Sequence, residues 1–124
     1  MKLRGIDFGN ALGASGVQGF FGEGYWFHKI PFIKPNFTGM TFVAKTTTLL
    51  PRKGNMTLTR HYTPKNLFPR CVKVKFRRAV MLNSVGLSNP GLGALLATGQ
   101  WQKRTNPFLL SIMSLADTTQ QRLE

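Results

Sequence analysis

The sequence predicts an α/β fold with a parallel sheet, and three observations support this expectation. Strand candidates and helix candidates alternate along the 124 residues, which is the order that a parallel sheet with crossover helices requires. Loops of small and polar residues follow the strand candidates, at the ends where parallel sheets bind ligands. Hydrophobic residues make up 42% of the chain, enough for one core of ordinary domain size.

The first two strand candidates lie near the N-terminus. Ile6-Asp7-Phe8 alternates apolar and polar residues and ends at the turn signal Gly9-Asn10. Residues 11–16 are small and mostly apolar, which predicts a buried strand that runs into a glycine-rich loop. Residues 17–39 are rich in Gly, Pro and aromatic residues, and we expect a loop there with room for one helix.

The middle of the chain predicts a further strand and then a hairpin. Thr41–Thr47 combines β-branched and aromatic residues and runs to a polar end, as strands do, and Pro51–Asn55 then turns the chain. We expect Val72–Phe76 and Ala79–Leu82 to pair as a hairpin. The bend would lie at Arg77-Arg78, although neither residue favours a hairpin turn.

The last part of the chain predicts a helix, a strand and the start of another helix. Leu92–Ala97 follows Asn-Pro-Gly and reads as a short helix that Gly99 ends. Phe108–Ile112 is a third candidate for a buried strand. Asp117 is placed to cap a helix, with Gln120 at its third position, and no stop signal follows. We therefore expect the sequence to end inside a structural element.

The charge balance suggests two readings of the basic segment Lys73–Arg78. The chain carries 17 Lys and Arg against 4 Asp and Glu, a net charge of +13. In the segment 72–77 apolar and basic residues alternate, which predicts a half-buried strand with a solvated basic face. We prefer this reading, so nucleic acid is not the expected partner. The alternative is a small nucleic-acid-binding module, with Phe68 and Phe76 beside the basic residues, whose affinity would fall steeply with salt.

Composition argues against several other classes of protein. The longest apolar runs are far shorter than the roughly 18 residues of a membrane span, and the first residues lack the apolar core of a secretory signal. We therefore expect a cytoplasmic protein that crosses no membrane. Cys71, His28 and His61 are too few soft ligands for a zinc site, so no metal is expected, and we interpret Cys71 as structural.

Three segments of small or polar residues follow predicted strands. They are Ala14-Ser15-Gly16, Lys45-Thr46, and the segment from Asn83 to Gly91. In a parallel α/β fold the loops at the carboxyl ends of the strands share one face, and ligands bind there. The sequence therefore predicts that these three segments surround one pocket.

The same residues carry a resemblance to a known family. The motifs are Ala14-Ser15-Gly16-Val17, Ala44–Leu49, Pro51-Arg52-x-Gly54-Asn55 and Asn83-Ser84-Val85-Gly86-Leu87-x-Asn89-Pro90-Gly91, followed by Pro107–Ile112. In this order they resemble the successive N-terminal motifs of the dihydroorotate dehydrogenase family. The start of the chain has no long apolar extension, and in this it resembles the soluble, FMN-dependent members and not the membrane-attached ones. Each motif alone is weak, but four in order make coincidence a poor explanation.

The resemblance implies a fold and an activity. The family folds as an eight-stranded β/α barrel that holds FMN and oxidises dihydroorotate to orotate in pyrimidine biosynthesis. A hydride leaves the substrate for flavin N5 while a base removes the neighbouring proton. Since such a barrel takes about 250 residues, we expect residues 1–124 to be one partial domain, the N-terminal portion of an incomplete (β/α)8 TIM barrel. The general base and later contacts would be absent from this chain. We therefore expect no activity from it alone, and a need for the missing barrel half or an oligomeric partner.

The resemblance also assigns roles to individual residues. Ala14, Ser15 and Gly16 would approach the flavin through backbone atoms, and Thr46 would add a hydrogen bond to it. Lys45 would lie beside both flavin and substrate, where a fixed ammonium stabilises the negative charge of the reduced flavin.

Substrate contacts are implied for the later loop. Asn83 would bind the pyrimidine ring, because an amide offers both a donor and an acceptor. The N–H groups of Val85, Gly86 and Leu87 would hold the substrate carboxylate.

The sequence departs from the family pattern at two places, and simpler interpretations exist for the residues named above. Leu50 stands where the family usually has an acidic residue, and Met56–Arg60 replaces a segment that usually contains proline. Lys45 would otherwise be a solvated lysine at a strand end, and Asn83 a turn residue. A non-catalytic remnant of the family is a further alternative.

Overall fold

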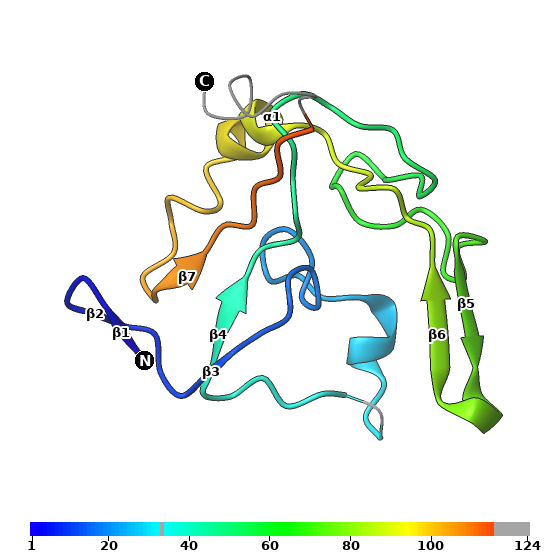
Figure 1. Cartoon of the computed structure of the whole chain (residues 1–124), viewed down its shortest axis with the longest axis horizontal. Helices are drawn as coiled ribbons and strands as arrows, with labels where there is room; N and C mark the ends of the chain where they lie inside the picture. The colour runs from blue at the N-terminus through cyan, green and yellow to red at the C-terminus, as the bar shows by residue number, and fades with distance from the viewer. Residues whose placement is uncertain (33, 116–124) are drawn as a thin grey trace.

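The computed structural model describes residues 1–32 and 34–115. It is a mixed α/β structure in which β3 (Ala11–Leu12), β4 (Met40–Val43) and β7 (Phe108–Leu109) form a parallel sheet in the order β3-β4-β7 (Figure 1). The predicted α/β class with a parallel sheet is therefore confirmed.

Each strand of the parallel sheet pairs with the next parallel strand along the chain. Ala11 pairs with Met40 and Leu12 with Thr41, while Phe42 pairs with Phe108. Because all three strands run in the same direction, the segments that follow them leave the sheet at one edge. This edge includes the residues after Leu12, Val43 and Leu109.

An antiparallel hairpin precedes the sheet. It consists of β1 (Lys2–Leu3) and β2 (Ile6–Asp7) and turns at Arg4 and Gly5, which have φ of 50° and 80°. The second strand was predicted from its alternation. The first was not, since two residues carry too little pattern to be recognised.

Two of the three predicted buried strands are more exposed than expected. Ala11 and Leu12 are both exposed, and in the last strand Leu110 and Ile112 are exposed while Phe108 and Leu109 are half-buried. The reason is that the core residues pack on the central strand. Regular pairing in β4 ends at Val43, earlier than predicted.

Helices are fewer than the alternating pattern predicted. Among the described residues α1 (Leu92–Ala97) is the one α-helix, as predicted, and Gly99 follows it with φ of 66°. The connection from β3 to β4 has only the 3-10 helix η1 (Trp26–Lys29). Glycines with positive φ interrupt helical backbone in that connection, at residues 19, 22 and 24. The helix start predicted at Asp117 lies outside the described residues.

The predicted basic hairpin is present. β5 (Val72–Lys75) pairs antiparallel with β6 (Val80–Asn83) through the 3-10 helix η2 (Phe76–Arg78). The predicted half-burial of its first strand holds for Val72 but not for Val74, which is 45% exposed. Met81 and Leu82 of β6 are also exposed, and the hairpin stands apart from the parallel sheet (Figure 1). Cross-strand pairs put basic and apolar side chains on one face, as at Lys73 and Leu82, so neither strand has a clean inner face.

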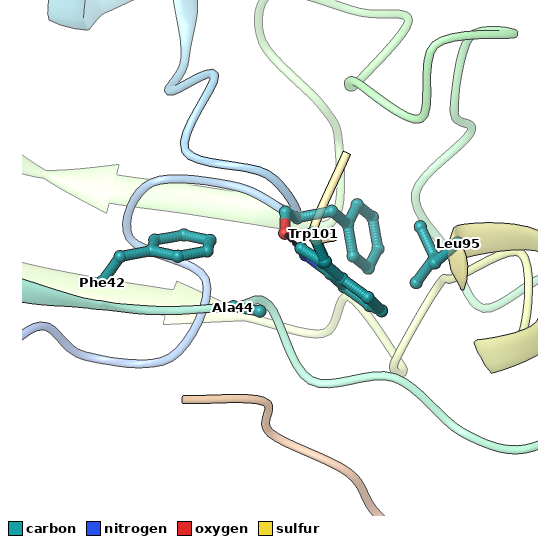
Figure 2. Packing of buried hydrophobic residues seen from close by; sticks show 5 residues of the cluster. Phe42, Ala44, Leu95 and Trp101 are labelled. Carbon is teal, nitrogen blue, oxygen red and sulfur yellow. Dashed lines mark hydrogen bonds between the residues drawn. The ribbon is translucent and has the colours of Figure 1, made fainter. Parts of the chain in front are cut away.

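The core lies where the central strand meets the loop after β3, α1 and the segment after α1. Phe20, Phe42, Ala44, Leu95 and Trp101 form it, and Figure 2 shows Ala44, Trp101 and Leu95 as neighbours. The Trp101 indole donates a 2.8 Å hydrogen bond to the Phe20 carbonyl, which satisfies its one polar atom.

The remaining sequence-based expectations concern cysteine, metals and membranes. Cys71 is buried and free. Among residues 1–32 and 34–115, no three His, Cys, Asp or Glu side chains are grouped to hold a metal ion. No helix in the same residues is long and apolar enough to span a bilayer.

Candidate functional site

A one-residue bulge follows β4. Val43 pairs with Leu109 and Thr47 pairs with Ile112, so three residues on one side face two on the other. The extra residue breaks the alternation of side chains between the two faces of a strand, and such bulges often re-aim side chains next to functional sites. The bulged segment is Ala44-Lys45-Thr46. Ala44 is buried in the core, whereas Lys45 and Thr46 are half-buried at the edge.

Lys45 joins the end of β4 to a distant loop. Its ammonium donates a 2.8 Å hydrogen bond to the Ser88 carbonyl and lies 4.8 Å from the centre of the Phe20 ring. Burial lowers the pKa of the Lys45 ammonium, because a partly desolvated charge is disfavoured. An ammonium has three N–H donors, and the structure uses one of them.

Gly16 lies against Lys45 with no space for a side chain. Its φ is +81°, and a Cβ there would come within 3.1 Å of the Lys45 Cγ. The Gly16 carbonyl accepts a 2.8 Å hydrogen bond from the Tyr25 hydroxyl. Burial, and then the nearby Glu23 carboxylate, raise the pKa of Tyr25, so this hydroxyl stays protonated and donates. Gly16 therefore fixes the backbone beside the lysine.

Three hydroxyl groups form a row across the carboxyl ends of the parallel strands. The Ser15 hydroxyl donates to the Ala44 carbonyl at 2.9 Å and lies 2.8 Å from the Thr46 hydroxyl. The Thr46 hydroxyl in turn lies 2.8 Å from that of Ser111. We call Ser15, Thr46 and Ser111 the hydroxyl row. Its members follow β3, β4 and β7, one from each strand.

In the loop after β6, the carbonyl groups of residues 85–87 accept hydrogen bonds from other parts of the chain. The Val85 carbonyl accepts from the Asn55 N–H at 2.9 Å, and the Gly86 carbonyl accepts from Arg52 Nε at 2.8 Å. The Leu87 carbonyl also accepts a hydrogen bond, at 2.7 Å. In contrast, the N–H groups of these three loop residues have no acceptor within the described chain. Three donors therefore remain for a ligand.

Asn89 fixes this loop to the segment after β4. Its carboxamide oxygen accepts from the Thr47 hydroxyl at 2.8 Å and from the Gly91 N–H at 2.9 Å. Its amide nitrogen donates to the Thr48 hydroxyl and the Leu87 carbonyl. Asn89 is buried, and all its donors and acceptors are engaged within the chain. Its function in this structure is to hold the loop in place.

The chain was compared with known proteins. Over 123 residues it is 35% identical to the catalytic subunit of dihydroorotate dehydrogenase B (NAD(+)) from Streptococcus pneumoniae R6. It is 32% identical to the corresponding subunit from the TIGR4 strain. The chain is similar to the catalytic subunits of dihydroorotate dehydrogenase B. The resemblance predicted from the sequence motifs is thus confirmed.

The match covers nearly all of this chain but only part of the relatives. It includes 98% of the chain and 33% of each dihydroorotate dehydrogenase subunit, so the chain spans about one third of their length. No family model matches the chain, and no solved structure matches it.

The structure brings together most residues that the dihydroorotate dehydrogenase motifs single out. Ser15 contacts Thr46, Gly16 lies against Lys45, and Lys45 reaches the loop after β6 through the Ser88 carbonyl. Ala14 is exposed next to Ser15. Asn83 is exposed at the end of β6, and its side chain has no hydrogen bond in the described part of the chain, so the structure does not join it to Lys45.

Sequence reasoning missed two residues of this site. Ser111 completes the hydroxyl row, and the Ser88 carbonyl holds the lysine. Ser111 follows a predicted strand, as Ser15 and Thr46 do, so the rule that selected those two would also have selected it. Ser88 contributes a backbone atom, and no sequence signal marks such a role.

Proposed function

We propose that the chain supplies part of the flavin and substrate site of a dihydroorotate dehydrogenase, which oxidises dihydroorotate to orotate in pyrimidine biosynthesis. The observation that carries this proposal is the position of Lys45. Lys45 is the residue before Thr46 of the hydroxyl row, and a hydrogen bond from its ammonium to the Ser88 carbonyl holds it at the loop of residues 83–91. A fixed, partly desolvated positive charge stabilises negative charge that develops during a reaction.

The fold supports a barrel. In an eight-stranded β/α barrel each parallel strand lies beside the next one in the chain, with the ligand site at the carboxyl ends. The order β3-β4-β7 has this property. We therefore propose that residues 1–124 form one partial domain, the N-terminal portion of a (β/α)8 barrel.

The residues around Ser15 fit FMN as the cofactor. Ala14 and Ser15 are exposed, and their backbone N–H groups have no acceptor in the described residues, so they are free to meet polar atoms of a flavin ring. Gly16 uses its own N–H and carbonyl within the chain, so it would contribute space and not a hydrogen bond. When bound, FMN would accept the hydride from the substrate.

Lys45 and Thr46 would complete the flavin contacts. The bond to Ser88 uses one of the three N–H donors of the Lys45 ammonium, and the other two remain available for the flavin and the substrate. The Thr46 hydroxyl lies in the hydroxyl row between Ser15 and Ser111, which limits its rotation. Both side chains are therefore held before any ligand arrives, as preorganised electrostatic catalysis requires.

The loop after β6 would bind dihydroorotate or orotate. The free N–H groups of Val85, Gly86 and Leu87 suit a carboxylate, because successive backbone donors bind anions. Asn83 would contact the pyrimidine ring through its amide. The Asn83 side chain is exposed and makes no hydrogen bond within the described residues, so it is free to turn toward a ligand.

We further propose that the chain alone does not turn over. The general base and the remaining flavin contacts would come from the other two thirds of the protein, or from a partner. The relatives are named as catalytic subunits of an NAD(+) enzyme, which implies a further subunit in their assemblies.

A second candidate function rests on the basic hairpin. Lys73, Lys75, Arg77 and Arg78 are exposed, and the acids Asp7 and Glu23 are bonded elsewhere, to the N-terminus and to the N–H groups of residues 20 and 21. A basic nucleic-acid-binding module would show affinity for a single-stranded oligonucleotide that falls steeply between 50 and roughly 200 mM salt. Salt-independent or absent binding contradicts it.

The flavin proposal is tested by titrating the intact chain with FMN and following flavin fluorescence. We expect saturable binding that Lys45→Met weakens about tenfold or more, the value of one hydrogen bond to a charged group. Lys103→Met is the matched control, because Lys103 is exposed in the loop after α1 and should leave binding unchanged. Equal FMN affinity of the Lys45 variant and the native chain would contradict the proposal.

A further inference from the structure

The hydrogen-bond direction along the hydroxyl row is fixed by its anchored end. The Ser15 hydroxyl donates to the Ala44 carbonyl, which has no proton to give. A hydroxyl has a single proton, so Ser15 can only accept from Thr46. The Thr46 proton is then used, and Thr46 can only accept from Ser111. Every proton in the row points toward Ala44.

This direction limits what the row can offer a ligand. All three hydroxyl protons are engaged, whereas one lone pair of Ser15, one of Thr46 and both of Ser111 remain. The row therefore presents hydrogen-bond acceptors. Lys45, next to Thr46, and the N–H groups of residues 85–87, in the loop that Lys45 bonds through Ser88, present donors. A ligand ring that has an N–H group facing the acceptors and negative charge facing the donors would match this arrangement.

Ser111 is the residue that controls the free end of the row. Its hydroxyl has no partner but Thr46 in the described residues, and it is half-buried at the end of β7. The bulge after β4 brings the two side chains together, because Thr47 and Ile112 resume pairing immediately after them. Backbone pairing thus places Ser111 beside Thr46, and its hydroxyl bond orients the threonine.

We infer that Ser111 is a positioning residue of the candidate site, which holds the Thr46 hydroxyl as an acceptor toward an N–H group of the bound flavin. The inference rests on the proposed flavin site but adds a residue and a direction to it. Ser111 acts through Thr46, so removing the Ser111 hydroxyl should alter the orientation of the Thr46 side chain and, as a consequence, the affinity for the ligand.

The first measurement needs no ligand. In the intact chain, NMR three-bond couplings of the Thr46 methyl carbon to the backbone report its χ1 angle. We expect one χ1 rotamer in the native chain and in Ser111→Thr, and averaging between rotamers in Ser111→Ala. Thr98→Val is the control, since it also removes a hydroxyl, which bonds the Leu95 carbonyl and the Gln100 N–H, but lies outside the row. An unchanged single rotamer in Ser111→Ala overturns the inference.

The second measurement is FMN affinity by fluorescence titration of the same four proteins. We expect about fivefold weaker binding for Ser111→Ala, the size of one neutral hydrogen bond, and native affinity for Ser111→Thr and Thr98→Val. Averaged rotamers with unchanged affinity would overturn the link to the ligand. If the native chain does not bind FMN, the flavin proposal fails, and the χ1 angles still decide whether Ser111 positions Thr46.

Discussion

The Lys45 ammonium donates a hydrogen bond to the Ser88 carbonyl 2.8 Å away, across 43 positions of sequence. This bond ties the bulge after β4 to the loop after β6. The two segments carry different motifs, and this bond, together with those of Asn89 to Thr47 and Thr48, joins them into one site. Predictions about this site and the core that supports it follow from the same geometry.

Replacing Lys45 with Met should change how stability depends on pH. Because burial lowers the Lys45 pKa, the folded chain loses this proton at a lower pH than the unfolded chain does. Between the lowered pKa and the ordinary value of 10.5, the unfolded state binds more protons, so this group makes stability rise with pH. Urea unfolding should show native stability rising relative to the variant as pH approaches 10.5. A constant difference at all pH values contradicts the burial of this charge.

Gly16→Ala should destabilise the chain more than Gly5→Ala does. Both glycines have nearly the same φ, +81° and +80°, so both variants carry the same backbone strain, about 1 kcal/mol. Only at Gly16 would the new Cβ meet the Lys45 side chain, whereas Gly5 has open space around it. Thermal unfolding of the two variants isolates that contact. Equal losses would show that the glycine and the lysine are not packed together.

Asn89→Ala should cost several kcal/mol, since it leaves the buried Thr47 hydroxyl and the Gly91 N–H without their acceptor. Asn83→Ala is the matched control, because that amide is exposed and should change stability by less than about 0.5 kcal/mol. Chemical denaturation measures both. A small loss for Asn89→Ala would mean that the loop is held by other contacts.

Leu95→Ala should cost about 2–5 kcal/mol of unfolding free energy, as large-to-small changes in a packed core do. Leu95 is fully buried in the core cluster that includes Phe20 and Trp101, whereas its neighbour Leu96 is 42% exposed. Leu96→Ala should therefore cost much less. Similar losses at both positions would contradict the core of Figure 2.

Local signals explain which parts of the fold were predictable. The hairpin at 72–83 and the helix Leu92–Ala97 are encoded by neighbouring residues, through alternation in one case and a glycine stop in the other. Burial was predicted less well, because it depends on what packs against a strand. Leu12 and Met81 are apolar but exposed, since the described core gathers on the central strand.

The candidate site was predictable where a simple rule applies and not elsewhere. The rule that parallel strands share a carboxyl edge brought Ser15, Lys45 and Thr46 together correctly. The bulge after β4 depends on the register of two strands far apart in sequence, so no local pattern reveals it. The roles of these residues toward flavin and substrate stay predictions.

The central proposal is that this chain supplies flavin and substrate contacts of a dihydroorotate dehydrogenase, as the matching third of the similar catalytic subunits would. The most direct measurement replaces that third of the Streptococcus pneumoniae R6 catalytic subunit with this chain and assays the purified chimera. We predict that it retains flavin, forms orotate from dihydroorotate, and loses about 100-fold or more in rate with Lys45→Ala. A folded chimera that holds no flavin, or that turns over equally well without Lys45, would contradict the claim.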